Sequence, residues 1–532
     1  MLKILTTQKK NMKQIIYTMF CMLLANVAWS QDLHLATGAA ITTSPGGLLY
    51  VGNNANIDVG ATLTTTSDAT KSGSFIVNGT TSGNITYKRY IDDLNWHLVS
   101  APVTNQSIPA FVNDADNAVA TSSTTGNFGV AHYNNNNAAN LRWTYHHATA
   151  GVDPNHAVLG TFNSGEGYSM KKAGKAEPGD YTFTGFMAND NVTVDIPKVE
   201  TTGSHLWSVI GNPYPSFLTI SEMVDATNFA AIDDGLYQFL YVWDEDADDA
   251  SYTTLPLGSP VQLAPGQAFM VKARSNNLQF IFKKKVQKHN SGTAALYRPS
   301  TAIPTISVHL TNGTLNKATN LEFLESSTTG LDPGYDAGAY QDGIPSFSIN
   351  THLVSDSQGI DVTRQSLPIN SLDSEVAIPL SIHAGIDEEV TFSVDANNLP
   401  DGISVYLEDT LNNTFTNLTN APLDIKITAA LSGIGRFYLR TTSGVLNTET
   451  NLVGAFINLY KTSNGTVKIT GLTSGSAATF SLFTILGKEV LATKFIAQNV
   501  QEISLPASLS TGVYIVGVVS DLGTFHKKII IE

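Results

Sequence analysis

Three aspartates alternate along one short acidic stretch and could hold a cation. Asp244, Asp246 and Asp248 are spaced as in the first half of a calcium-binding loop, where carboxylate oxygens converge on one hard ion. An EF-hand is excluded, because Asp249 stands at the place of the required glycine and Leu255 at that of the bidentate glutamate. The three alternating aspartates are therefore a candidate calcium site, and no other cofactor is expected. A solvated acidic hairpin tip is the favoured alternative.

Two further groups of polar residues have the right chemistry for ion binding. Asp332 and Asp336 flank a Pro-Gly-Tyr turn, where their carboxylates suit either an ion or the backbone hydrogen bonds that cap a turn. His146, His147 and His156 are close together in the sequence, but they lie among loop residues. They are therefore interpreted as neutral surface histidines and not as a zinc site.

No motif in the sequence indicates catalysis. The chain lacks His-Glu-x-x-His, Gly-x-Ser-x-Gly and a glycine-rich phosphate loop. The two carboxylates of a glycosidase have no fixed spacing along a chain, so a single sequence does not reveal them. The protein is accordingly expected not to be an enzyme.

Aromatic residues border a run of asparagines at 134–137. Tyr133, Trp143 and Tyr145 could stack on a sugar ring or a partner, or they could pack in the core. The asparagine run itself is interpreted as a flexible loop and not as a site.

Composition excludes several classes of partner. The 532 residues carry 45 acidic and 30 basic side chains, a formal charge of −15, so binding to nucleic acid or anionic lipid has no electrostatic basis. Only 14% of the residues are charged, whereas Thr, Ser, Asn and Gly are abundant. These residues favour strands and turns, and they predict an all-β protein.

The first thirty residues have the features of a Sec signal peptide. They contain four lysines and no acidic residue, and an apolar run covers 15–28. Ala28-Trp29-Ser30 is a small-x-small cleavage site before Gln31, and removal of the four lysines takes the charge from −15 to −19. The run is too short for a membrane anchor, and no later segment is apolar enough to cross a membrane. Cleavage also removes Cys21, the only cysteine, so the mature chain is expected to have no disulfide.

Apolar residues spaced two apart indicate strands that bury one face. Pairs spaced two apart between 31 and 88, such as Leu49 with Val51 and Ile57 with Val59, predict stacked rungs of a β-solenoid. A plain hairpin meander is the alternative. Alternating strands predict a β-sandwich region over 89–298 and a second β-sandwich over 299–443, and a Thr-, Ser- and Asn-rich linker follows.

The segment 444–532 is predicted to be a small Ig-like sandwich. Tyr514, Val516 and Val518 fall two apart, as on one face of a half-buried strand. The order Leu-Gly-Lys at 486–488, LSTGVYIV at 509–516 and KKIIIE at 527–532 resembles the type A C-terminal sorting domain of Bacteroidetes proteins that the type IX secretion system exports.

The body of the chain is similar to other cargo of the same system. It shares blocks such as WHLVSAPV at 96–103, GNPYPS at 211–216 and PGQAFMV at 265–271. One departure is that 457–461 reads INLYK, where such tails often have a Tyr-Pro-Asn-Pro turn. The resemblance implies that the type IX machinery is a partner, and that the protein is secreted or held on the outer cell surface.

The expected function is adhesion or surface interaction without catalysis, with a protein or polysaccharide as ligand. A secreted carbohydrate-active protein, either a hydrolase or a binding module, is the main alternative, and a passive surface-layer protein is a third. Two carboxylates facing each other across about 5–10 Å would favour a hydrolase. A flat or aromatic-lined sandwich face would favour binding.

Overall fold

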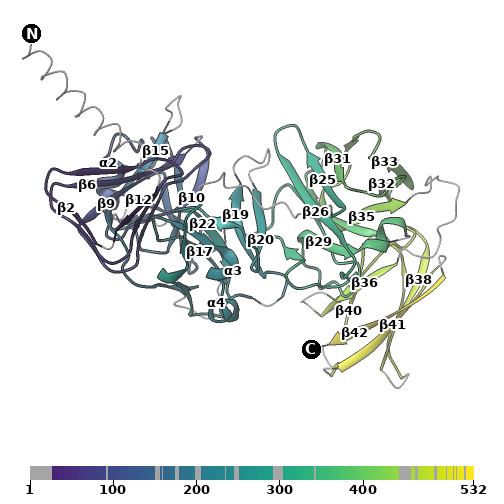
Figure 1. Ribbon diagram of the computed structural model, residues 1–532. Helices are drawn as coiled ribbons and strands as arrows, with labels where there is room; N and C mark the ends of the chain where they lie inside the picture. Colours follow the sequence, from purple (N-terminus) through teal and green to yellow (C-terminus); the bar gives the residue numbers. More distant parts are fainter. Residues whose placement is uncertain are drawn as a thin grey trace, which may run out of the picture. The chain divides into compact units, whose positions relative to one another are not determined.

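The regular secondary structure of the described residues is almost all β-strand, which confirms the all-β prediction (Figure 1). The computed structural model describes residues 27–531 except for 31, 92–93, 140, 150–155, 159, 174–178, 198–204, 234, 245–250, 291–302, 341–342, 375, 443–456, 462–464, 485–487, 499, 507–508, 511 and 521–522. Contacts divide the chain into two compact units. The first unit comprises Met1–Asp234, Phe239–Glu245 and Tyr252–Arg298, and the second comprises Gly235–Gln238, Asp246–Ser251 and Pro299–Glu532.

Helices within the described ranges are few and short. They are α2 (Ile108–Asn113), α3 (Ile220–Met223) and α4 (Ala226–Ala231), with 3-10 turns η1 (Lys284–Val286) and η2 (Ile369–Asp373). Side-chain caps explain where two of them begin. The Ser107 hydroxyl accepts from the amide of Ala110, and the Asp225 carboxylate accepts from the amides at the start of α4.

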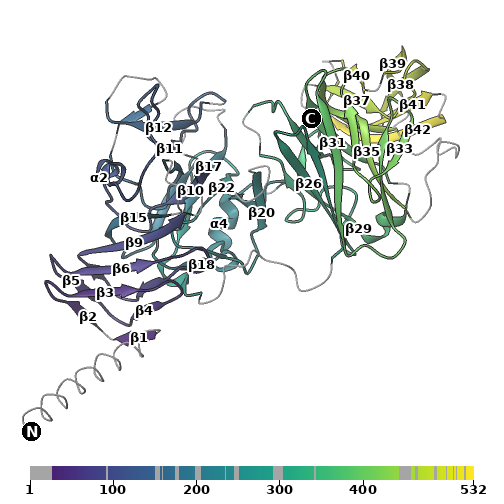
Figure 2. The same ribbon diagram turned by 90° about the horizontal axis from the view of Figure 1, so that it is seen from above.

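The first unit begins with a short β-solenoid, stacked in Figure 2. Its strands are β1 (Val27–Ser30), β2 (Leu33–Leu35), β3 (Ala40–Thr43), β4 (Leu48–Val51), β5 (Ala55–Ile57), β6 (Thr62–Thr66), β7 (Ser74–Val77), β8 (Thr81–Ser82) and β9 (Asn84–Ile91). They pair in parallel as β2-β5-β8, β3-β6-β9 and β1-β4-β7. A hairpin meander would pair consecutive strands in antiparallel fashion, so the parallel ladders support the solenoid.

The register of the ladders explains the apolar pairs of the sequence. Val51 stands beside Val77, and both are fully buried or nearly so. The predicted inward-facing pair of Ile57 and Val59 is wrong for Val59. The strand β5 ends at Ile57, and Val59 lies in the following turn with 95% of its surface exposed. Gly60 closes that turn at φ +84°, a backbone conformation that favours glycine.

The rest of the first unit consists mainly of antiparallel sheets. Its strands are β10 (Trp96–Ser100), β11 (Val130–Tyr133), β12 (Trp143–His147), β13 (His156–Val158), β14 (Gly167–Lys171), β15 (Gly179–Phe186), β16 (Val192–Ile196), β17 (Trp207–Gly211), β18 (Phe217–Thr219), β19 (Phe239–Asp244), β20 (Ser251–Pro256), β21 (Gln262–Leu263), β22 (Ala268–Lys272), β23 (Leu278–Phe282) and β24 (Gln287–Lys288). A five-stranded sheet runs β10-β14-β11-β12-β13, a four-stranded sheet runs β17-β22-β19-β20, and β16 pairs with β23. In the five-stranded sheet, β12 and β13 pair in parallel. Strands from these three sheets line the site described below.

One long sheet dominates the second unit. Its strands are β25 (Thr305–Thr311), β26 (Asn316–Leu324), β27 (Ala337–Gly338), β28 (Ser348–Thr351), β29 (Val362–Pro368), β30 (Ile378–Ala384), β31 (Glu389–Asn397), β32 (Ser404–Asp409), β33 (Thr414–Asn417), β34 (Leu423–Lys426) and β35 (Leu431–Thr442). The hydrogen-bonded order is β33-β32-β35-β30-β28-β29-β26-β25-β31-β34, and β27 pairs with β29. Phe392 of β31 and Phe437 of β35 are far apart in this order, yet their ring centroids are 5.0 Å apart. The sheet therefore folds back on itself as a sandwich.

The C-terminal segment is a smaller sandwich. Its strands are β36 (Asn458–Lys461), β37 (Thr466–Thr470), β38 (Ala477–Thr484), β39 (Glu489–Ile496), β40 (Val500–Ser504), β41 (Gly512–Ser520) and β42 (Gly523–Ile531). They form two sheets, β36-β37-β40 and β39-β38-β41-β42. Tyr514, Val516 and Val518 are buried between them, as their alternation predicts, whereas Val519 on the opposite face is 51% exposed.

Candidate functional site

The three aspartates of the predicted calcium site are only partly within the described chain. Asp244 is the last residue of β19, and its side chain is outside the described part. Asp246 and Asp248 lie outside the described residues altogether. Elsewhere, the residues that the structure describes contain no group of three His, Cys, Asp or Glu side chains able to hold a metal ion. The calcium site stays a prediction.

Asp332 and Asp336 cap a turn with their carboxylates. Asp336 is fully buried and accepts hydrogen bonds from the amide and hydroxyl of Ser366, at 2.6 and 2.9 Å, and from the amide of Asp332 at 2.6 Å. Asp332 accepts from the amide and hydroxyl of Thr328. Burial raises the pKa of Asp336 to about 6, although these hydrogen bonds oppose the shift. Of the two alternatives for this pair, these contacts favour turn capping.

The histidines are not the surface residues that the sequence suggested. His146 and His147 lie on β12 and are 6% and 8% exposed, because β12 is an interior strand of the five-stranded sheet. His156 belongs to β13, and its side chain is outside the described part. The expectation of surface histidines is therefore wrong for His146 and His147.

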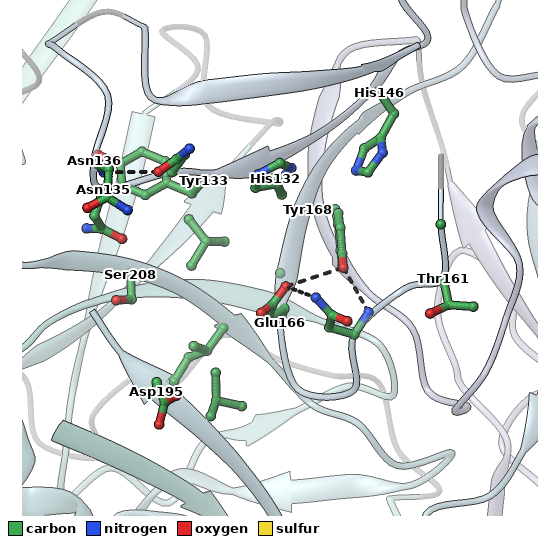
Figure 3. Close-up of a pocket in the computed structure, with 17 residues that line it drawn as sticks. His132, Tyr133, Asn135, Asn136, His146, Thr161, Glu166, Tyr168, Asp195 and Ser208 are labelled. Atoms are coloured by element: carbon green, nitrogen blue, oxygen red, sulfur yellow. Dashed lines mark hydrogen bonds between the residues drawn. The ribbon is translucent and has the colours of Figure 1, made fainter. Parts of the chain in front are cut away.

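A pocket of about 480 Å³ opens in the first unit, beside His146 (Figure 3). The residues that line it are His132, Tyr133, Asn134, Asn135, Asn136, His146, Gly160, Thr161, Asn163, Glu166, Gly167, Tyr168, Val194, Asp195, Ser208, Val209 and Ile210. They come from β11, β12, β14, β16, β17 and the loops next to these strands. Its volume is within the roughly 300–1,000 Å³ typical of small-ligand sites.

Two glycines bring Glu166 to the pocket. A Cβ on Gly167 would stand 2.5 Å from Val209 Cγ1, and one on Gly165 would stand 2.6 Å from Val194 Cγ2. Only glycine allows the backbone here to pack so closely on β16 and β17. The amide of Gly211 also donates to the carbonyl of Gly165 at 2.9 Å. The carboxylate between the two glycines is thereby held at the junction of two sheets.

Hydrogen bonds fix the side chain of Glu166. Its Oε2 accepts from Asn163 Nδ2 at 2.8 Å and from the hydroxyl of Tyr168 at 3.4 Å. The Tyr168 hydroxyl accepts in turn from the amide of Asn163 at 2.9 Å. Burial, and then the charge of Glu166, raise the pKa of Tyr168, so the phenol stays protonated.

The two histidines of the pocket lie side by side. The ring centroids of His132 and His146 are 5.5 Å apart. Burial lowers the pKa of His132, and the charge of Glu166 offsets only part of that effect. His132 is consequently neutral at pH 7.

The asparagine run, which was expected to be a flexible loop and not a site, forms a hydrogen-bonded turn whose first three residues line the pocket. The amide of Asn136 donates to Asn134 Oδ1 at 3.0 Å, and Asn135 Nδ2 donates to the carbonyl of His205 at 2.7 Å. The Tyr133 hydroxyl is hydrogen-bonded to His205 Nε2 at 2.7 Å. Figure 3 shows this turn on one side of the pocket.

The aromatic residues around the run have different roles. Tyr133 lines the pocket, and Trp143 packs edge-on against it with ring centroids 5.1 Å apart. Tyr145 packs against Trp96 at 5.7 Å. Trp143 and Tyr145 are not lining residues, so they support the wall and do not form it.

Ser208 is a buried polar residue of the pocket lining. It is 6% exposed on β17, and its hydroxyl has no hydrogen-bond partner among the described residues. A buried hydroxyl without a partner is unfavourable, and such groups in native proteins often meet a ligand or a water molecule.

Sequence reasoning missed most of this pocket. His132, Glu166, Asp195 and Ser208 lie on or beside four different strands, and nothing in their spacing connects them. The local signals were Tyr133, an aromatic residue beside the asparagine run, and a glutamate between two glycines in the Gly-Glu-Gly-Tyr block at 165–168.

Comparison with protein families gives two matches. Residues 7–440 match the domain of unknown function DUF8693, and residues 462–532 match the secretion system C-terminal sorting domain. The second match confirms that the tail is a type IX sorting domain, so the protein is exported to the cell surface or beyond. No curated protein matches the chain. Within the part that the structure describes, no helix combines the length and the apolar character needed to span a membrane.

Proposed function

The chain belongs to the DUF8693 family, and we propose that it is a non-enzymatic adhesion or surface-interaction protein that binds its partner through the pocket of the first unit. The sorting domain directs the chain to the outside of the cell, where such a partner would be met. The observation that carries the proposal is a preformed polar pocket with a buried hydroxyl, that of Ser208, still lacking a partner among the described residues.

Binding accounts for the polar groups of the pocket better than catalysis does. Ser208 has no hydrogen bond to a histidine base among the described residues, as an activated nucleophile would need. The carboxylate of Glu166 is already engaged by Asn163 and Tyr168. Such restraint suits a recognition group, which gains from being held in one orientation before the ligand arrives.

One observation favours the hydrolase as a second candidate. Glu166 and Asp195 line the same pocket, as the acid and the second carboxylate of a glycoside hydrolase would. Release of reducing ends from polysaccharide by the wild type, with loss in both Glu166→Gln and Asp195→Asn, would replace the adhesion proposal with this one.

Cell attachment tests the adhesion proposal. Strains carrying the wild type, a gene deletion, or Thr161→Trp would be compared on protein-coated and polysaccharide-coated surfaces under flow. Thr161 is exposed and lines the pocket, so tryptophan there blocks it. Thr193→Trp is the matched control, because Thr193 is exposed on β16 outside the lining.

We expect the deletion and Thr161→Trp strains to attach poorly, at equal surface amounts of protein, while Thr193→Trp attaches normally. Normal attachment of the deletion strain would reject the adhesion role. Normal attachment of Thr161→Trp alone would move the binding site away from this pocket.

A further inference from the structure

We propose that the pocket takes a neutral glycosyl unit, and that the buried hydroxyl of Ser208 is one of the groups that recognise it. This inference rests on the proposed binding role of the pocket and names the chemistry of its ligand. The source of the sugar, a polysaccharide or a glycoprotein glycan, is left to the arms of the test.

The charges of the lining disfavour anionic ligands. Its described residues include no lysine or arginine, so phosphate, sulfate and uronic acid groups would meet no fixed positive charge among them. His132 is buried with a lowered pKa, and so does not supply one at neutral pH. The carboxylates of Glu166 and Asp195 would repel an anion further.

The lining also suits the hydroxyls of a sugar. It offers acceptors, such as the carboxylate of Glu166, and groups that both donate and accept, such as the hydroxyls of Ser208 and Thr161. A sugar hydroxyl both donates and accepts, so several hydroxyls on one ring can satisfy both kinds of group.

Apolar atoms in the same pocket match the other face of a sugar ring. Tyr133 and Tyr168 present aromatic rings, while Val194, Val209 and Ile210 present aliphatic side chains. A pyranose has C–H faces that pack on such surfaces while its rim forms hydrogen bonds. The pocket has this combination of an apolar wall and polar corners.

Ser208 makes the inference testable without disturbing the fold. In the free protein its buried hydroxyl has no partner among the described residues, so removing it sacrifices no hydrogen bond there. Ser208→Ala should therefore melt at or above the temperature of the wild type. The same change should weaken a ligand that donates to or accepts from this hydroxyl.

The test uses the exported protein, purified, on an array of neutral and acidic oligosaccharides taken both from polysaccharides and from glycoproteins, with spermidine as the amine probe. We expect neutral glycans to bind, and Ser208→Ala to lose about tenfold in affinity with its melting temperature kept. Ser169→Ala on β14 is the control, because Ser169 does not line the pocket. It should bind like the wild type.

The outcomes separate the inference from the function beneath it. If the protein binds only acidic glycans or only spermidine, the proposal of a neutral glycosyl ligand is rejected. It is also rejected if the protein binds no glycan while cells that carry it attach normally. Unchanged affinity of Ser208→Ala would overturn the role of its hydroxyl. If the wild-type protein neither binds glycans nor supports attachment, both the inference and the proposed function are rejected. If it binds glycans but does not support attachment, only the adhesion role is rejected.

Discussion

Arg436 and Asp409 form a two-pronged ion pair inside the second unit. Arg436 Nε donates to Asp409 Oδ1 at 3.0 Å and Nη2 donates to Oδ2 at 2.8 Å, and the two side chains are 8% and 3% exposed. Arg440 also pairs with Glu408, its Nε donating to Oε2 at 2.7 Å. The Gly-Arg-Phe-Tyr-Leu-Arg block at 435–440 therefore places two charges in a core strand, each matched on β32.

Arg436→Met should strongly destabilise the second unit. It leaves the carboxylate of Asp409 buried without its partner, which costs about 3–5 kcal/mol. Urea unfolding of the full chain would measure the loss. The exposed pair of Lys426 and Asp387 is the control, and Lys426→Met should cost about 0–1 kcal/mol. Similar losses for both would show that the buried pair is not a structural requirement.

The stability of the second unit should fall as pH rises through the titration of Asp336. Its folded pKa is about 6 against an ordinary 3.8, so the folded state holds the proton more tightly than the unfolded one. The resulting stabilisation is complete below pH 3.8 and is lost by about pH 6, an effect of about 2–3 kcal/mol. Asp336→Asn does not titrate. The free energy of unfolding of the wild type, relative to that of this variant, should therefore fall from pH 4 to pH 7. A difference that stays constant over this range would contradict the raised pKa of Asp336.

Val516→Asp should unfold the sorting domain. Val516 is fully buried on β41, where its burial is worth about 1.5–3 kcal/mol, and aspartate would add an unpaired buried charge. Val519→Asp is the matched control, because Val519 is 51% exposed on the other face. We expect the first variant alone to be missing from the cell surface in protease-shaving assays, with the front of the chain still folded. Equal loss of both variants would mean that the outer face of β41 is also needed.

Deletion from Asn451 onward should stop export at the periplasm. The sorting domain lies within the deleted part, and the Sec signal expected at the front directs only the first membrane crossing. Cell fractionation and immunoblotting would locate the truncated chain. Its appearance on the surface in normal amounts would contradict the role of the tail.

Calcium should raise the melting temperature if Asp244, Asp246 and Asp248 share an ion, because a ligand that binds only the folded state stabilises it by mass action. The triple Asn variant should lose this rise. Thermal unfolding in calcium and in chelator provides the measurement. Identical melting of the wild type in both would leave the solvated hairpin tip as the explanation.

Features that depend on local order were readable from the sequence. Alternation at Tyr514, Val516 and Val518 predicted a buried face, because side chains on a strand point to opposite sides in turn. The solenoid and the sorting domain were predicted for the same reason, since each repeats a short pattern or carries its motifs within one segment. Val59 shows the limit, because alternation does not tell where a strand ends.

The pocket depended on long-range pairing, which one sequence does not encode in any local pattern. β11 pairs with β14, and the Glu166 loop bridges to β17, so His132, Glu166 and Ser208 become neighbours only when these strands are assembled. Alternation also does not distinguish an edge strand from an interior one, so the burial of His146 on β12 came from the sheet around it. The sequence alone determined the fold class and the export route. Tertiary structure decided where polar groups meet, because strand order sets which side chains share a space.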